Sequence, residues 1–145
     1  MSETADSLNE AKTFNQELIE QFRANGGQIV RGMFKGAPLL LLTTTGAKSG
    51  QPRTAPLAYT RDGDRLVIIA SKGGAPTNPD WYHNLIANPT ATVEVGAEKF
   101  PVRTQIPTGA ERDRLFDQMV AQMPGFAEYQ RQTTRRIPVV TLERT

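Results

Sequence analysis

The sequence predicts an α+β protein in which about six short, mainly antiparallel strands form a closed or half-closed barrel with helices packed outside it. Three observations lead to this fold class. Short apolar or β-branched runs are bounded by turn residues, several connections of only two residues require antiparallel neighbours, and few helical patterns separate the strands. The 145 residues fit one domain, 1–145, with an N-terminal amphipathic helix over residues 1–27 and the barrel with its helices over residues 37–145.

The first predicted element is an amphipathic helix. Ser7-Leu-Asn-Glu10 has the spacing of a capping box, and Asn25-Gly26-Gly27 is a typical helix end. Apolar residues recur between them at three- and four-residue spacing: Leu8, Ala11, Phe14, Leu18, Ile19 and Phe22. The polar face mixes acidic with basic side chains and lacks the cationic bias of membrane-surface helices. A helix that covers the core is the favoured interpretation, and membrane-surface binding is the alternative.

The remaining elements follow from further runs and turns. Strands are predicted at Leu39–Thr45 and at residues 54–60, 65–71, 90–95, 98–106 and 137–143, with hairpin turns at Asp62-Gly63 and Gly96. Asn78 and Pro79 indicate an N-cap and a first helical residue for a short helix over residues 79–87. Thr108-Gly-Ala-Glu111 has the spacing of a second capping box, which opens a helix to about Met123, and a short helix is expected to follow to about Thr133.

The composition excludes several kinds of chemistry. The chain has no cysteine, which removes disulfides, thiolate nucleophiles, Cys-ligated zinc and iron–sulfur clusters. His83 is the only histidine, so a His-based metal cluster is impossible and no metal is expected. A Ser-His hydrolase would depend wholly on this one residue, whose more common role in a helix is structural. We therefore infer that the protein binds a cofactor and that the cofactor does the chemistry.

Net charge and hydropathy limit which binding partners and which cellular location are expected. A net charge of +2 is too mild to indicate nucleic-acid binding, and the predicted strands carry few aromatic side chains (Tyr59 and Phe100) on which bases could stack. No nucleic-acid partner is expected. The N-terminus is polar and acidic, and the longest apolar run, residues 37–42, is far shorter than the roughly 20 residues that span a bilayer. We expect a cytoplasmic protein.

The first candidate site is residues 46–53, which connect the first two strands and which we call the basic turn. Gly46 and Gly50 permit tight backbone geometry with exposed amide donors, Lys48 and Arg53 supply positive charge, and Ser49 supplies a hydroxyl. These are the parts of an anion-binding nest, although the glycine spacing is not that of a Walker P-loop. A solvated turn without a ligand is the alternative.

Residues 71–74, Ser-Lys-Gly-Gly, form a second candidate, which we call the serine turn. This turn follows the third strand and leads into the helix capped by Asn78, whose free amides and partial positive charge suit anionic groups. If both turns lie at one end of the barrel, Lys48, Arg53 and Lys72 can together hold a phosphate-bearing ligand through charge-assisted hydrogen bonds of roughly 1.5–3 kcal/mol each.

Three motifs in order resemble the deazaflavin-dependent nitroreductase family of actinobacteria. They are Leu39-Leu-Leu-Leu-Thr-Thr-Thr-Gly-Ala-Lys-Ser-Gly-Gln-Pro-Arg53, then Ala70-Ser-Lys-Gly-Gly74, then Asn78-Pro-Asp-Trp-Tyr-His-Asn-Leu-Ile-Ala-Asn-Pro89. The resemblance extends over residues 30–143, and Tyr129 and Arg136-Ile-Pro138 also match. It implies a split β-barrel that binds the deazaflavin coenzyme F-420, which carries a phosphate and an acidic oligoglutamate tail. FMN is the alternative cofactor, because related split barrels bind it.

The resemblance also implies roles for individual residues. Lys48, Ser49, Arg53 and Lys72 are expected to contact the phosphate and tail. The ring and ribityl chain are expected to lie against Thr54, Ala55, Pro56, Leu57, Ile69, Ala70, Ser71, Trp81, Tyr82, His83 and Asn84. Ala47 and Asp80 complete the candidate cofactor-binding set.

The implied reaction is hydride transfer from the reduced coenzyme to a small planar acceptor such as a quinone, an activated enone or a nitroaromatic compound. Nitro-drug-activating members carry several tyrosines where this chain has Met123, Phe126 and Tyr129, and this difference favours a quinone or an enone over a nitroimidazole as the acceptor. These three residues form the candidate substrate pocket, and core packing is the alternative for Met123 and Phe126. Ser71 and Tyr129 are the candidate catalytic residues, as proton donors. A non-catalytic carrier, a monomer or a homodimer, and peripheral association with the inner membrane face stay open.

Overall fold

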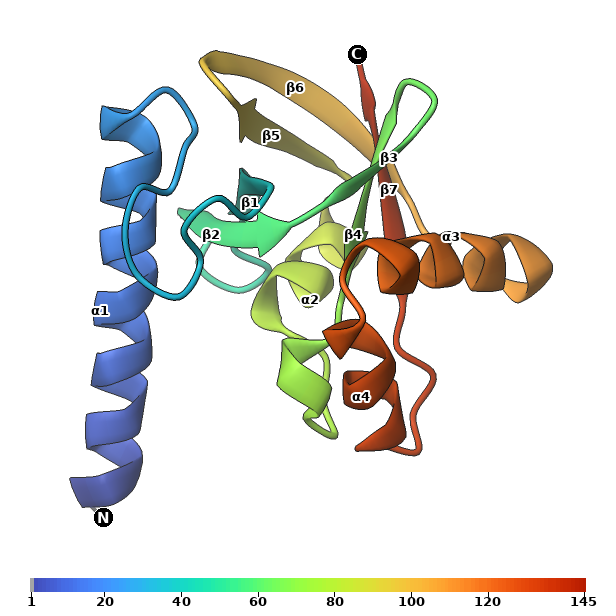
Figure 1. The fold of residues 1–145 in the computed structure, drawn as a ribbon, viewed down its shortest axis with the longest axis horizontal. Helices are drawn as coiled ribbons and strands as arrows, with labels where there is room; N and C mark the ends of the chain where they lie inside the picture. The colour runs from blue at the N-terminus through green and yellow to red at the C-terminus, as the bar shows by residue number, and fades with distance from the viewer. Residues whose placement is uncertain (1) are drawn as a thin grey trace.

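The computed structural model describes the backbone of residues 2–145 and the side chains of residues 13–145. It has the predicted α+β composition (Figure 1). The elements in chain order are α1 (Ser2–Ala24), β1 (Leu39–Thr45), β2 (Pro52–Ala58), β3 (Thr60–Asp62), β4 (Arg65–Ile69), the 3-10 turn η1 (Lys72–Gly74), α2 (Asp80–Ala87), β5 (Thr90–Val95), β6 (Glu98–Gln105), α3 (Gly109–Gln122), α4 (Gly125–Arg131) and β7 (Val139–Arg144).

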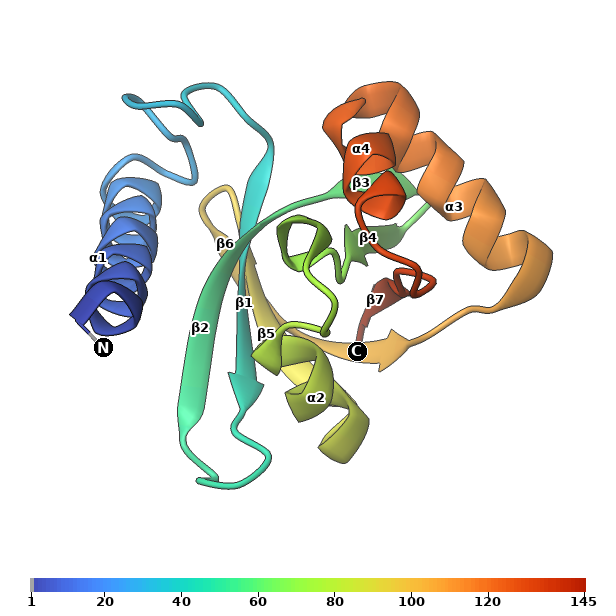
Figure 2. The ribbon, with the colours of Figure 1, turned by 90° about the horizontal axis from the view of Figure 1, so that it is seen from below.

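All seven strands belong to one antiparallel sheet in the order β2-β1-β5-β6-β7-β4-β3. The two edge strands, β2 and β3, are consecutive in the chain and are separated only by Tyr59, so the sheet curls round until its two edges are parts of one extended run (Figure 2). The prediction of one strand at residues 54–60 is therefore wrong, and the sheet has seven strands where about six were expected. At Tyr59 the chain changes partner from β1 to β4, and its N–H donates to Pro38 O at 3.3 Å instead of to a strand.

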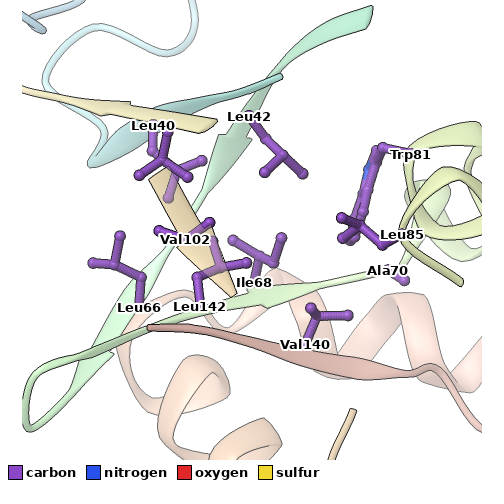
Figure 3. Close-up of a cluster of buried hydrophobic side chains, with 11 residues drawn as sticks. Leu40, Leu42, Leu66, Ile68, Ala70, Trp81, Leu85, Val102, Val140 and Leu142 are labelled. Atoms are coloured by element: carbon purple, nitrogen blue, oxygen red, sulfur yellow. The ribbon is translucent and has the colours of Figure 1, made fainter. Parts of the chain in front are cut away.

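Several strands are buried on both faces, which explains their continuous apolar sequences. In β1, Leu40 and Leu42 point into the barrel, whereas Leu39 and Leu41 pack beneath α1. β4 and β7 divide their apolar side chains in the same way between the barrel interior and a cluster under α3 and α4. The interior cluster is formed by Leu40, Leu42, Leu66, Ile68, Ala70, Trp81, Leu85, Val93, Val102, Val140 and Leu142 (Figure 3).

Helix α1 covers the barrel through Leu18, Ile19 and Phe22, as the apolar spacing predicts. The helix begins at Ser2, so the predicted start at Ser7 is wrong, and the side chains of Ser7, Leu8, Glu10 and Ala11 lie outside the described residues. The predicted end is confirmed, since Gly27 has φ +92° and its N–H donates to Phe22 O at 2.8 Å. A Cβ at Gly27 would lie 2.4 Å from Gly96 Cα, so glycine is needed where the helix end meets the β5–β6 turn.

The second predicted capping box is only half correct. Thr108 is the N-cap of α3, but its side chain makes no capping hydrogen bond. Glu111 does not reach back to the helix start, because its carboxylate binds Arg65 at 2.9 Å and Arg114 at 3.0 Å. Two bonds to cationic arginines replace the single bond that this carboxylate would make to a backbone N–H.

Candidate functional site

The basic turn and the serine turn lie at the same end of the barrel. The basic turn follows β1 and the serine turn follows β4, and these two strands are joined in the sheet through β5, β6 and β7. Each neighbour is antiparallel, so β1 and β4 run in the same direction and their C-terminal ends meet at one rim. Helix α2 lies at this rim, with Trp81 and Leu85 beside Ala70 of the interior cluster (Figure 3).

The basic turn is closed by its own hydrogen bonds. Gly46 N donates to Gln51 O at 2.8 Å, Gly50 N donates to Gly46 O at 2.9 Å, and Gln51 N donates to Ser49 Oγ at 3.2 Å. A Cβ at Gly46 would lie 2.5 Å from Ser49 Oγ, so this close approach requires glycine. The N–H groups of Lys48 and Ser49 have no partner among the described residues. They are the amides of this turn that a ligand can use.

Asn84 of α2 holds the basic turn in place. Its Oδ1 accepts from Ala47 N at 2.9 Å, and its Nδ2 donates to Thr44 Oγ1 at 3.0 Å. Asn84 and Thr44 are both buried. Two of the candidate cofactor-binding residues, Ala47 and Asn84, therefore bind each other. Their shared bond fixes the turn against the helix.

The cations of both turns have no acidic partner. Lys48, Arg53 and Lys72 are exposed, and none of them takes part in an ion pair with a described carboxylate. Among the described residues, the only side-chain hydrogen bond of Lys72 joins its Nζ to Thr77 Oγ1 at 3.4 Å. Three cations that face solvent at one rim give this rim a local positive charge that suits an anionic ligand.

The serine turn has an unusual backbone. Lys72 has φ +47° and is the only residue other than glycine with a positive φ among the described residues. Left-handed conformation at such a residue costs roughly 1–3 kcal/mol and tends to be kept at functional sites. Gly74 has φ +86°, and a Cβ there would lie 3.0 Å from Tyr129 O, so the turn packs tightly on α4.

Arg135, which precedes β7, holds the serine turn in place through hydrogen bonds to its backbone carbonyls. Its Nε donates to Ala75 O at 2.9 Å and its Nη2 donates to Ser71 O at 2.9 Å and Ala70 O at 3.2 Å. Its Nη1 donates to Asn78 Oδ1 at 2.6 Å. The prediction of Asn78 as an N-cap is therefore wrong: Pro79 is the N-cap of α2, and the Asn78 side chain binds Arg135 instead. No local pattern in the sequence indicates Arg135.

The remaining cofactor-binding candidates differ in exposure. Thr54, Ala55, Pro56 and Leu57 are half-buried along β2, where Thr54 Oγ1 shares a hydrogen bond of 2.8 Å with Thr43 Oγ1. Ile69, Ala70 and Ser71 are buried at the end of β4. On α2, Trp81 is buried and Tyr82 is half-buried, whereas Asp80 and His83 are exposed. The hydroxyl of Ser71 has no hydrogen-bond partner among the described residues.

The candidate substrate-pocket residues lie on or beside α4. Phe126 is buried in the cluster under α3 and α4, with Met123 and Tyr129 packed against this cluster. The rings of Phe126 and Tyr129 meet edge to face at 5.4 Å. Because α4 packs on the serine turn, Tyr129 and Ser71 belong to neighbouring segments. Phe126 is a core residue in the structure, as the alternative interpretation expects.

A further hollow that the sequence did not indicate lies at the same rim. It has a volume of about 300 Å³ and lies between Tyr82 of α2, the segment after β6 and the segment before β7. Its other lining residues are Ile106, Pro107, Thr108, Gly109, Arg112, Arg136, Ile137 and Pro138. Among the described residues, no three side chains of His, Asp or Glu are grouped as a metal site would require, and no helix is both long and apolar enough to cross a bilayer.

The structure is a curled antiparallel barrel with two glycine turns, three exposed cations and helix α2 at one rim, which is a split-barrel fold. The model of the F420H(2)-dependent quinone reductase family matches residues 15–144. The chain therefore belongs to the F420H(2)-dependent quinone reductase family.

Individual relatives agree with this assignment. An F420H(2)-dependent quinone reductase of Mycobacterium tuberculosis is 44% identical over 128 residues, which is 85% of each chain. The solved structure of an F420-H2 dependent reductase, FDR-A, is 42% identical, with a TM-score of 0.68, and the match covers 73% of this chain and 94% of that one. A structure described as a domain-swapped dimer is 36% identical, with a TM-score of 0.70, over 97% of this chain and 99% of that one. The split barrel implied by the motifs is confirmed.

Proposed function

We propose that this chain transfers a hydride from reduced coenzyme F-420 to a quinone-type acceptor and that the rim bearing the two turns holds the coenzyme. The observation that carries the proposal is the set of three cations without acidic partners, Lys48, Arg53 and Lys72, around two glycine turns at one end of the barrel. FMN carries a single phosphate, so it needs fewer cations at its site than coenzyme F-420, which carries a phosphate and an acidic tail.

The residues at the rim fit such a coenzyme. Lys48 and Arg53, with the free N–H groups of Lys48 and Ser49, supply donors for phosphate oxygens on one side. Lys72 of the serine turn supplies a third exposed cation at the rim. Between them the half-buried strand β2 and the ring of Tyr82 offer an apolar surface for a planar ring. Asn84 keeps the first set of donors in place through its bond to Ala47 N.

Bound coenzyme F-420 in its reduced form supplies a hydride, that is, two electrons and one proton. A quinone that accepts the hydride also needs one further proton to become a hydroquinone. The Ser71 hydroxyl is a suitable proton donor, because it lies at the rim and is not hydrogen-bonded to any described residue. Ser71→Ala should therefore lower kcat with little change in coenzyme affinity, and Tyr129→Phe tests the second donor in the same way.

The test is a titration and a turnover assay on one preparation. Purified protein is titrated with coenzyme F-420 and with FMN, and the oxidation of the reduced coenzyme is then followed with menadione, an enone and a nitroaromatic compound. We expect binding of coenzyme F-420 and turnover of the quinone. Binding of FMN alone would favour the alternative cofactor, and tight coenzyme binding without turnover on every acceptor would favour a carrier.

A pair of matched variants tests the rim itself. The variant Lys48→Ala with Arg53→Ala removes two exposed cations from the site, whereas Arg61→Ala with Lys99→Ala removes two exposed cations from the opposite end of the barrel. We expect the first variant to weaken coenzyme binding roughly 10- to 100-fold, because each contact to an anion contributes about 1 kcal/mol or more even when exposed. Equal affinity of the two variants would remove the basic turn from the site.

Assembly and membrane contact are part of the same proposal. We infer a homodimer from the relative whose structure is described as a domain-swapped dimer, with a monomer as the alternative. Light scattering of the purified chain over a range of concentrations distinguishes the two states. Sedimentation with anionic and with neutral vesicles tests peripheral membrane contact, for which binding to anionic vesicles is the expected positive result.

A further inference from the structure

Three consecutive N–H groups of the serine turn share one concavity. Ser71 is in the right-handed helical region (φ −79°, ψ −37°), and Lys72 follows with φ +47°. A right-handed residue followed by a left-handed one directs successive N–H groups into a shared concavity that binds anions. The N–H groups of Ser71, Lys72 and Gly73 have no hydrogen-bond partner among the described residues.

Arg135 binds the opposite ends of two of these peptide units. The carbonyl of Ala70 belongs to the peptide unit that carries Ser71 N–H, and the carbonyl of Ser71 belongs to the unit that carries Lys72 N–H. Both carbonyl oxygens accept from Arg135 Nη2, at 3.2 and 2.9 Å. The described chain has no cis peptide bond, and in a trans unit the C=O and N–H point in opposite directions. The two N–H groups therefore point away from Arg135.

The bonds to Arg135 also make these N–H groups stronger hydrogen-bond donors. A carbonyl that accepts from a cation is polarised, and the N–H of the same unit becomes a stronger donor. Arg135 has only neutral acceptors, whereas Arg65 and Arg112, the other arginines that are not exposed, each bind a carboxylate. Burial lowers the pKa of Arg135, and no neighbouring charge opposes this effect. Its positive charge is thus left for a ligand to balance.

We propose that Arg135 is a positioning residue that aims and polarises the N–H groups of Ser71, Lys72 and Gly73 toward an anionic oxygen of the cofactor. The inference rests on the proposed function, since the cofactor is the ligand that the rim binds. It adds a role for a residue that touches neither cofactor nor acceptor. It also explains why Lys72 keeps a left-handed conformation, because a right-handed Lys72 would turn the following N–H, that of Gly73, out of the concavity.

The test follows backbone amides directly. Isotope-labelled protein is titrated with coenzyme F-420, and the amide resonances are recorded by NMR. We expect the amide protons of Ser71, Lys72 and Gly73 to shift downfield in the wild-type protein, as they do when they donate to an anion. Arg135→Met should weaken coenzyme binding roughly tenfold and abolish these shifts at saturation, and Arg135→Lys should restore part of both effects. Arg131→Met, at an exposed arginine of α4 that binds only Glu128, should change neither.

Each outcome has a distinct meaning. Coenzyme binding without shifts at the three amides overturns the inference and leaves the proposed function intact. Absence of coenzyme binding to wild-type protein overturns the proposed function. If Arg135→Met does not fold, Asn78→Ala and Arg135→Lys are compared instead. Asn78→Ala removes one acceptor of Arg135 but keeps both carbonyl contacts, so it should retain the amide shifts, whereas Arg135→Lys should reduce them. Loss of the amide shifts in Asn78→Ala together with wild-type shifts in Arg135→Lys would overturn the inference.

Discussion

Replacing Asn84 by alanine should destabilise the protein and release the basic turn at the same time. The substitution removes two hydrogen bonds, Ala47 N to Oδ1 at 2.9 Å and Nδ2 to Thr44 Oγ1 at 3.0 Å. Each bond contributes about 1 kcal/mol, and a buried group left without its partner costs about 1–3 kcal/mol. Thr44 is 2% exposed, so its Oγ1 would lose the Asn84 donor and water could not replace it. Ala47 is exposed, so its N–H can bind water instead. The expected loss is about 2–4 kcal/mol.

A loss of this size is measurable for a chain of this length. One kcal/mol corresponds to a change in Tm of roughly 2–4 °C for chains of about 150 residues, so a loss of about 2–4 kcal/mol should lower Tm by roughly 4–16 °C. Coenzyme affinity should fall as well, because the bond from Ala47 N to Asn84 holds the turn that carries the free amides of Lys48 and Ser49 against α2. Calorimetry gives Tm, and fluorescence titration gives Kd below the transition.

Two further variants separate position from charge. Asn84→Asp can keep both bonds if the Thr44 hydroxyl reverses and donates to the carboxylate, so its Tm should fall less than that of Asn84→Ala. The new negative charge beside Lys48 should nevertheless weaken coenzyme binding. Asn88→Ala, at an exposed asparagine just after α2, serves as the control and should change neither property. A Tm for Asn84→Ala within about 1 °C of wild type would refute the reasoning, because the loss of both Asn84 hydrogen bonds should lower the free energy of unfolding by more than that shift represents.

Two other predictions concern the fold around the site. Gly27→Ala places a Cβ 2.4 Å from Gly96 Cα at a φ of +92° and should lower Tm well beyond the effect of Gly26→Ala, which has φ +62° and open space; equal Tm values for the two variants would contradict this. The Arg114 side chain hydrogen-bonds Asp62 and lowers the pKa of that carboxyl to about 2. The stability this gives is complete above the ordinary Asp pKa and disappears as pH falls from about 4 to about 2. In acid titrations, Asp62→Asn should lose less stability than wild type over this window, and superimposable curves would contradict the assignment.

Strand and turn positions could be predicted from the sequence where local chemistry decides them. The bounds of β1 and β5 agree residue for residue, because β1 is an apolar and β-branched run and both strands end at turn residues. The split at Tyr59 could not be predicted, since an extended run keeps the same pattern when it changes partner. The same holds for Arg135, which binds backbone carbonyls 64 and 65 positions earlier in the chain. The pairing of β4 with β7, which lie about 70 positions apart in the chain, brings Arg135 to these carbonyls.

The role of Asn84 shows the same limit at the site. The motif that contains it indicates a cofactor-binding residue, and the side chain is indeed at the rim. Its two polar atoms, however, bind Thr44 and Ala47, which lie 40 and 37 positions away. A motif records that a residue type is required at a position but does not say whether the residue touches the ligand or holds a neighbour that does.

The mild net charge of +2 conceals a rim that is locally basic. Ion pairs of the described residues neutralise arginines on or beside other elements, namely Arg23, Arg65, Arg112, Arg114, Arg131, Arg136 and Arg144. None of these pairs involves a cation of the basic turn or the serine turn. Arg31, Lys35, Arg61, Lys99 and Arg103 are also exposed and without ion pairs among the described residues, so the rim is distinguished by the position of its cations beside two glycine turns. Exposed charges are screened over about 8 Å at physiological ionic strength, so Lys48 and Arg53 act within a short range of the coenzyme, whereas half-buried Arg135 acts through the backbone and is screened less.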